Sequence, residues 1–229
     1  MEERRHTSAE YERELQEIKD GLLYLGAMTE KAIERGVVAL LERDSALAKQ
    51  IVCDDDQIDR LDVEIEEKCV RLLALRQPAA RDLRFITTAI KITGHLERIG
   101  DMASNIAEKI VTLNEIPQIK PYIDLPRMVE IVRGMIHKSL DALVREDVDL
   151  AQQVRTEDTV IDQLNDQIFR ELLTFMIEDP HKIQVCLYIM QISKSLERIA
   201  DHAEGIASMV IYMVTGKSVR HQPTCEPVG

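Results

Sequence analysis

An internal duplication is the feature that most limits what this chain can fold into. The segment ALLERDSALAKQIVCDDDQIDRLD (39–62) lies over ALVREDVDLAQQVRTEDTVIDQLN (142–165) without gaps. A second match pairs HLERIGDMASNIAE (95–108) with SLERIADHAEGIAS (195–208), after a three-residue deletion in the loop that follows Pro180. A period of about 100 residues is too long for the helical units of a solenoid. The sequence therefore predicts two tandem copies of one bundle.

Helical periodicity accounts for both copies. Apolar residues recur at three- and four-residue spacing, and long stretches without proline leave room for uninterrupted helices. The pattern predicts six long helices, the first over about residues 8–43. Asp44 is the expected N-cap of the second helix, Pro78 the first residue of the third, and Asp179 with Pro180 the start of the sixth.

A proline-rich segment, NEIPQIKPYIDLP, divides the chain almost in half. We expect a first three-helix repeat over 8–115, a linker over 116–126 and a second three-helix repeat over 127–215. The polar, proline-bearing end of the chain, 216–229, is expected to be a disordered tail. Aromatic residues make up only 3% of the chain, which suits helix packing better than a β-sandwich. The predicted fold class is all-α, as two tandem three-helix bundles.

Each copy carries two pairs of acidic residues at i,i+4 spacing, on consecutive helices. The pairs are Asp55 with Asp59 and Glu97 with Asp101 in the first copy, and Asp158 with Asp162 and Glu197 with Asp201 in the second. Like charges at this spacing repel, which costs an isolated helix about 0.2–0.5 kcal/mol unless a cation is near. Consecutive helices joined by a short turn run antiparallel, and a rise of about 1.5 Å per residue brings the two pairs of one copy to similar heights. We therefore expect them to face each other.

The acidic stripe is expected to lie on the surface, because Glu97 and Asp101 are each two residues away from an apolar core position, Ile99 and Ala103, and so point away from the buried face. Carboxylate oxygens suit Mg²⁺, Mn²⁺, Ca²⁺ or iron, and imidazole and thiolate, which favour zinc, are missing from the pattern. Asn105 extends the first stripe after Asp101, whereas the second copy has Gly205 there, with Glu204 beside it. The sequence thus predicts two metal sites that differ.

An ordinary solvated acidic face is the alternative interpretation. Surface ion pairs with Arg60, Arg98 or Arg198 would neutralise such a face, at a gain of about 0–1 kcal/mol each. His202 follows Asp201 by one residue and is therefore turned by about 100° from the acidic stripe, which makes it a bystander to the site.

Composition and motifs exclude several function classes. The net charge of −12 argues against nucleic acid and anionic membrane as partners. The longest apolar run is too short to span a bilayer, so we expect a soluble protein without direct membrane insertion. The four cysteines are scattered without CxxC spacing, as in a reducing cytoplasm. No nucleophile elbow, P-loop, GxGxxG or kinase motif is present, so catalysis has no visible candidate.

The motifs of the two copies resemble those of the PhoU family, the phosphate-specific transport system accessory proteins. Each copy has D-x-x-I-D-x-L on its middle helix and L-E-R-I-[GA]-D-x-A on its last. The segment PAARDLRFI (78–86) is similar to the family's P-x-x-x-D-L-R, and the resemblance covers about residues 10–215.

The resemblance implies a cytoplasmic negative regulator of the phosphate-starvation response rather than an enzyme. The implied partners are the phosphate ABC transporter ATPase and the phosphate-sensing histidine kinase, and members of the family are often homodimers. The resemblance also implies multinuclear metal clusters, one per repeat, with iron, manganese, magnesium or zinc as candidate ions. The implied ligands are Asp55, Asp59, Glu97, Asp101, Asp158, Asp162, Glu197 and Asp201, with Asn105 and Glu204 as additional candidates. A carboxylate-bridged metalloenzyme and a metal-free helical adaptor remain as alternatives.

Overall fold

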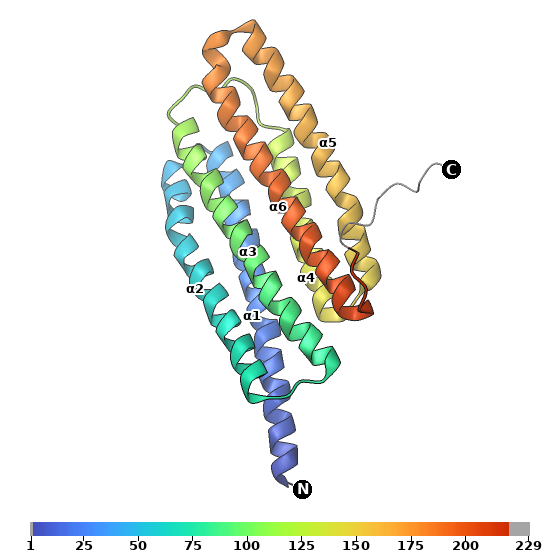
Figure 1. The fold of residues 1–229 in the computed structure, drawn as a ribbon. Coiled ribbons are helices and arrows are strands. Elements are labelled where there is room, and N and C mark those ends of the chain that lie inside the picture. Colours follow the sequence, from blue (N-terminus) through green and yellow to red (C-terminus); the bar gives the residue numbers. More distant parts are fainter. Residues whose placement is uncertain (1, 220–229) are drawn as a thin grey trace, which may run out of the picture.

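The computed structural model describes residues 2–219. This part of the chain forms six long helices and one short 3₁₀ helix, joined by loops (Figure 1). The helices are α1 (Glu2–Leu41), α2 (Ser45–Leu75), α3 (Ala80–Leu113), α4 (Asp124–Arg145), α5 (Val148–Glu178), η1 (Pro180–Lys182) and α6 (Ile183–Thr215). No strand occurs in this part of the chain. The all-α prediction with six long helices is confirmed.

The turn that ends the first helix of each bundle is the same in both copies. Asp44 caps α2, as predicted, because its carboxylate accepts hydrogen bonds from the backbone N–H groups of residues 46 and 47. Asp147 caps α5 in the same way through the N–H of Leu150. The preceding residues, Arg43 and Glu146, both adopt left-handed backbone conformations, with φ of 56° and 55°. The duplication seen in the sequence is therefore also a duplication of local structure.

Several predicted helix ends were wrong. The first helix begins at Glu2 rather than near residue 8. The third begins at Ala80, because Ala79 is still extended (ψ 161°) and Pro78 lies outside the helix. Asp179 accepts a hydrogen bond from the N–H of His181 and so caps η1, which places the start of α6 at Ile183.

The linker is shorter than expected because α4 begins at Asp124, inside the range 116–126. A proline lacks only an N–H that is unpaired in the first turn of a helix, so Pro126 fits there without breaking α4. At the other end, residues 216–219 follow α6, while 220–229 of the predicted tail lie outside the described residues.

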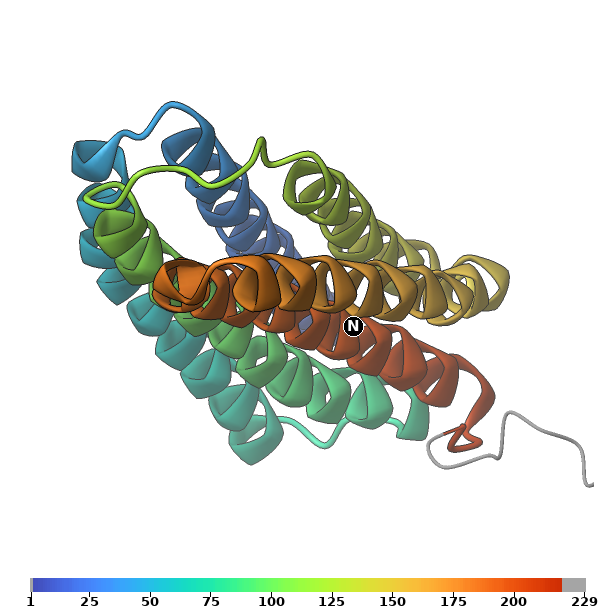
Figure 2. The same cartoon turned by 90° about the horizontal axis from the view of Figure 1, so that it is seen from above.

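The two three-helix bundles join through their inner helices. α3 contacts α6, and α1 contacts α4, which gives a central group of four helices. α3 and α6 run antiparallel side by side (Figure 1). Among the helices of residues 2–219, α2 contacts only α1 and α3, and α5 packs only on α4, α6 and η1, so both lie at the periphery. Segment 114–123 crosses from the first bundle to the second at one end of the molecule (Figure 2).

A single apolar core runs through both bundles, with fully buried residues such as Leu22, Ile86, Leu96, Met128 and Ile199. Burial of the apolar stripe of each helix explains why the sequence periodicity located the elements. Among residues 2–219, no helix combines the length and the apolar character that crossing a membrane requires.

Candidate metal centre

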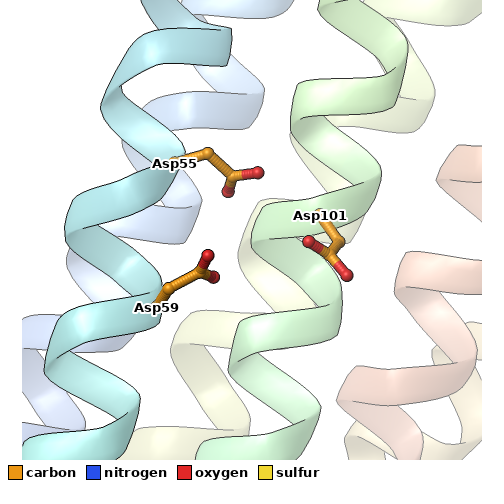
Figure 3. Close-up of side chains that lie close together, drawn as sticks. All are labelled: Asp55, Asp59 and Asp101. Atoms are coloured by element: carbon orange, nitrogen blue, oxygen red, sulfur yellow. The ribbon is translucent and has the colours of Figure 1, made fainter.

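Three carboxylates meet on the surface of the first bundle, at the seam between α2 and α3. Asp55 and Asp59 lie one turn apart on α2, and Asp101 lies on α3. One carboxylate oxygen from each residue lies within 4.8 Å of those of the other two. Figure 3 shows Asp55 and Asp59 extending from α2 toward the helix that carries Asp101. The facing that helix spacing predicts is therefore present for these three residues, which we call the first acidic cluster.

Gly100 brings the two helices together at this point. A Cβ atom built at this position would lie 2.9 Å from Cγ2 of Ile58 and 3.2 Å from Oδ1 of Asp55. Only a residue without a side chain lets α3 approach α2 this closely. The equivalent residue of the second copy is Ala200.

The electrostatics of the first acidic cluster favour a cation. Burial raises the pKa of Asp55 to about 6, and the negative charges of Asp101 and Asp59 add to this rise, while a hydrogen bond from Ser104 opposes it. Burial also raises the pKa of Asp59, with a further contribution from Asp101. These carboxyl groups thus retain protons closer to neutral pH than isolated aspartates do, and a bound cation would replace those protons.

Glu97 lies at the edge of this cluster rather than inside the group of three. Burial raises the pKa of the Glu97 carboxyl, and Asp101 and Asp62 raise it further. Asp62 belongs to the neighbourhood although sequence reasoning missed it. Its Oδ1 atom is buried and has no hydrogen-bond partner among the described residues. The signal was available, because Asp62 follows Asp59 by three residues and so shares its helix face.

Asn105, the additional candidate of the first copy, is exposed. Its side-chain amide nitrogen donates a hydrogen bond to the backbone carbonyl oxygen of Asp101, at 2.7 Å. That part of the side chain is therefore turned to its own helix.

The second acidic cluster consists of Asp158 and Asp162 on α5 and Glu197 and Asp201 on α6. Burial raises the pKa of Asp158 to about 7, and the charges of the other three and of Glu204 contribute. The pKa values of Asp162 and Asp201 are also raised by burial, and next by Glu197. The four expected residues of the second copy therefore lie in one electrostatic neighbourhood.

Two cations distinguish the second cluster from the first. Lys194 forms an ion pair with Glu197, with 2.6 Å between Nζ and Oε2. Arg155 pairs with Glu204 at 2.8 Å, and Glu204 also accepts a hydrogen bond from Ser208. The first copy has Gly94, Val52 and Ser104 at the positions of Lys194, Arg155 and Glu204. The second cluster is therefore partly neutralised by the chain itself, and Glu204 is already engaged.

Within residues 2–219, the three arginines that could neutralise an ordinary acidic face make no direct ion pair with it, although the charge of Arg98 slightly opposes the rise in the pKa of Glu97. In the part of the chain that the structure describes, Arg60, Arg98 and Arg198 form no ion pair with a carboxylate within 4 Å.

The second copy has Gly205 where the first has Asn105, and the contact between the two bundles explains this difference. A Cβ atom at Gly205 would lie 2.6 Å from Cε1 of His95, on the facing helix α3. His95 and His202 in turn share a hydrogen bond, with 3.0 Å between their Nδ1 atoms. Burial, followed by the charges of Arg98 and Arg198, lowers the pKa of His202. Gly205 therefore makes room for this histidine pair.

The comparisons with known proteins agree over most of the chain. The family model described as PhoU domain matches residues 22–110 and 125–210. A phosphate-specific transport system accessory protein PhoU homolog of Pseudomonas putida is 43% identical over 217 residues, covering 94% of this chain and 85% of its own. The phosphate-specific transport system accessory protein PhoU of Escherichia coli K12 is 33% identical over 217 residues, covering 95% and 90%.

Two solved structures have the same fold. The crystal structure of PhoU from Pseudomonas aeruginosa superimposes with a TM-score of 0.86 at 42% identity, covering 90% of this chain and all of that one. The crystal structure of the phosphate transport system regulatory protein PhoU from Streptococcus pneumoniae gives a TM-score of 0.84 at 27% identity, covering 91% and 99%. Both structures cover both bundles, and the family model likewise matches one range in each bundle.

Proposed function

This chain belongs to the PhoU family, and we propose that it is a metal-binding, non-enzymatic regulator of phosphate uptake. Relatives are named accessory proteins of the phosphate-specific transport system, which supports a role beside that system. In our proposal the chain acts in the cytoplasm as a homodimer, together with the phosphate ABC transporter ATPase and the phosphate-sensing histidine kinase. Its action restrains the starvation response when phosphate is plentiful.

The metal-binding part of the proposed function rests on one observation, the first acidic cluster. Three carboxylates converge within 4.8 Å with no cationic partner among the described residues, and the buried Oδ1 of Asp62 lies nearby without a hydrogen bond. Uncompensated negative charge at this density is unfavourable, and a divalent cation or iron relieves it. The donor set is made of carboxylate oxygens, which fits hard ions such as Mg²⁺ and Mn²⁺ and also iron.

Asp55, Asp59 and Asp101 would hold the ion of the first copy, with Glu97 and Asp62 at its edge. Asp158, Asp162, Glu197 and Asp201 would hold that of the second. When bound, the ion would supply positive charge that joins a peripheral helix to an inner one, α2 to α3 or α5 to α6. The chain's own residues position the carboxylates and keep the site open to a partner protein, because Asp59 and Asp101 are exposed.

This openness also supports a regulator over a metalloenzyme. Metal-assisted hydrolysis needs a shaped, water-excluding cavity, whereas two of the three residues of the first acidic cluster are exposed to solvent. A metal-free helical adaptor is the remaining alternative, and metal analysis separates it from the proposal.

The experiment is elemental analysis of protein purified without chelator. We expect bound metal in the wild-type chain and its loss in the double variant Asp101→Ala, Asp201→Ala. Glu64→Ala, an exposed acidic residue of α2 outside the cluster, serves as the matched control. Equal metal content in all three proteins would contradict the ligand assignment. A pull-down of the transporter ATPase and the kinase by wild type and double variant then tests whether the sites matter for partner binding.

A further inference from the structure

A cavity of about 480 Å³ lies where α3 begins and α6 ends, at the lower end of the molecule in Figure 1. Its walls come from α1, the first turns of α3, the turn between α4 and α5, and the last turn of α6. Three cations line it, Lys19, Arg81 and Arg84. No residue of the cavity belongs to either acidic cluster, so it is a separate feature of the molecule.

The charges of this cavity do not balance. Arg81 forms an ion pair with Glu146 at 2.5 Å, and Asp82 accepts a hydrogen bond from the hydroxyl of Tyr11 at 3.1 Å. Lys19 and Arg84 are half-buried, yet neither forms an ion pair with any carboxylate in residues 2–219. The lining thus holds three cations and two carboxylates, Asp82 and Glu146, which leaves a net positive charge, and Lys19 and Arg84 have no carboxylate of the described residues within ion-pair distance.

Each of the two cations is held in place by a group that leaves its charge unpaired. Nζ of Lys19 lies 5.3 Å from the ring centroid of Phe85, a cation–π contact. Nε of Arg84 donates to the backbone carbonyl of Met213 at 3.0 Å, in the last turn of α6. Those contacts explain where each side chain lies. They do not explain why no carboxylate of the described residues lies within ion-pair distance of either one, although Asp82 and Glu146 line the same cavity.

The second copy shows that the bundle itself does not require these cations. Counting back from the match of Leu96 with Leu196, Gln184 is equivalent to Arg84 and Lys182 to Asp82. The position equivalent to Lys19, counted from the match of residues 39 and 142, is Tyr122. The two cations thus belong to the first copy alone: Arg84 lies within the segment PAARDLRFI, which the metal site does not use, and Lys19 lies on α1.

We propose that this cavity binds a phosphate group. An arginine guanidinium offers a planar fork of donors that matches phosphate oxygens, and a lysine ammonium adds a second positive charge. Leu15 and Phe85 supply apolar wall beside the cations, so the phosphate group arrives either as free inorganic phosphate or on a small organic molecule. The inference does not depend on metal binding by the acidic clusters.

The test is isothermal titration calorimetry on the full chain after metal removal with EDTA. Inorganic phosphate and adenosine monophosphate are the two probes, and they distinguish the free from the organic source. Citrate tests whether carboxylates serve equally well. We expect at least one phosphate probe to bind, and Arg84→Gln and Lys19→Gln each to weaken it by about tenfold or more. Arg60→Gln, an exposed cation outside the cavity, is the matched control and leaves binding unchanged.

Several outcomes would overturn the assignment: no binding of either phosphate probe, binding that both cavity variants retain, or tighter binding of citrate than of phosphate. The same titration of protein that has not been treated with EDTA is the comparison: binding seen only before EDTA treatment would place the anion at a metal ion rather than in the cavity. Circular dichroism checks that the variants fold. Lys19→Gln removes no hydrogen bond seen in the structure and so keeps the test valid if Arg84→Gln loosens the end of α6.

Discussion

Gly205 of α6 lies so close to the imidazole of His95 on α3 that a methyl group in its place would be 2.6 Å from Cε1. The equivalent residues of the other copy are Asn105 and Ser195. Asn105 is exposed and donates a hydrogen bond to the backbone of its own helix, so the close contact of glycine with histidine is described for one side of the junction between the bundles.

Gly205→Ala is expected to lower the free energy of unfolding by about 1–3 kcal/mol, because the added methyl group overpacks the contact with His95. Gly134→Ala, in the middle of α4 with no atom within 4 Å of the new methyl group, is the control and should gain about 0.5–1 kcal/mol. Adding His95→Ser to Gly205→Ala should relieve the clash. Urea denaturation measures all four proteins, and equal stability of the two alanine variants would refute the packing argument.

The two acidic clusters should bind metal unequally. Asp101→Ala is expected to remove the tighter-binding site, and Asp201→Ala the weaker one, because Lys194 and Arg155 already neutralise part of the second cluster. Titration of metal-free single variants with Mn²⁺ gives the affinity of the site that each one keeps. The explanation fails if the Asp101→Ala protein binds Mn²⁺ as tightly as the Asp201→Ala protein.

Lys194→Gln tests the cause of that difference. Removing the ammonium group frees Glu197 from its ion pair, so the Mn²⁺ affinity of the second cluster should rise. Lys194 is 60% exposed, which limits the expected gain to about fivefold. The measurement uses the Asp101→Ala background so that only the second site titrates. Lys49→Gln, an exposed lysine of α2, should leave the affinity unchanged.

The stability of the metal-free protein should carry a pH dependence that comes from Asp55. Its pKa in the folded chain is about 6, above the ordinary 3.8, so the folded state holds the proton more tightly than the unfolded state. The stabilisation from that proton is complete below about pH 4 and is lost as the pH rises through about 6. Asp158, at about 7, loses its contribution at slightly higher pH.

Asp55→Asn removes this titration. Measured in EDTA, the melting temperature of the variant should therefore rise relative to that of the wild type between pH 5 and pH 7.5. Glu64→Gln serves as the exposed control on the same helix. A constant difference between variant and wild type across this range would contradict the raised pKa.

The duplication made most of the fold predictable. Asp44 and Asp147 fixed two helix starts because capping depends on local sequence, and the apolar periodicity located all six helices. The start of α3 was misplaced because Pro78 is as compatible with the extended segment before a helix as with its first turn. In the same way, Pro126 is compatible both with a linker and with the first turn of a helix, and α4 begins two residues before it.

The site was predictable where it depends on spacing along one helix. The pairs Asp55 with Asp59 and Glu97 with Asp101 follow from helix geometry, and the turn between α2 and α3 brings Asp101 to face Asp55 and Asp59, while Glu97 lies at the edge. The pairing of Arg155 with Glu204 joins two helices at a register that no single-helix pattern reveals. The contact of Gly205 with His95 depends on packing between the copies, which the sequence of either copy alone does not contain.

Because α2 and α5 lie at the periphery, we expect these two helices to unfold locally more easily than the four inner helices. The four inner helices contact one another in a closed ring, while each outer helix is attached along one side only. Amide protons of α2 and α5 should therefore exchange with solvent through sub-global opening, at a lower free energy than those of α3 and α6. A cation held between α2 and α3 would slow that exchange in α2, so metal occupancy would be recorded in the backbone dynamics of this outer helix.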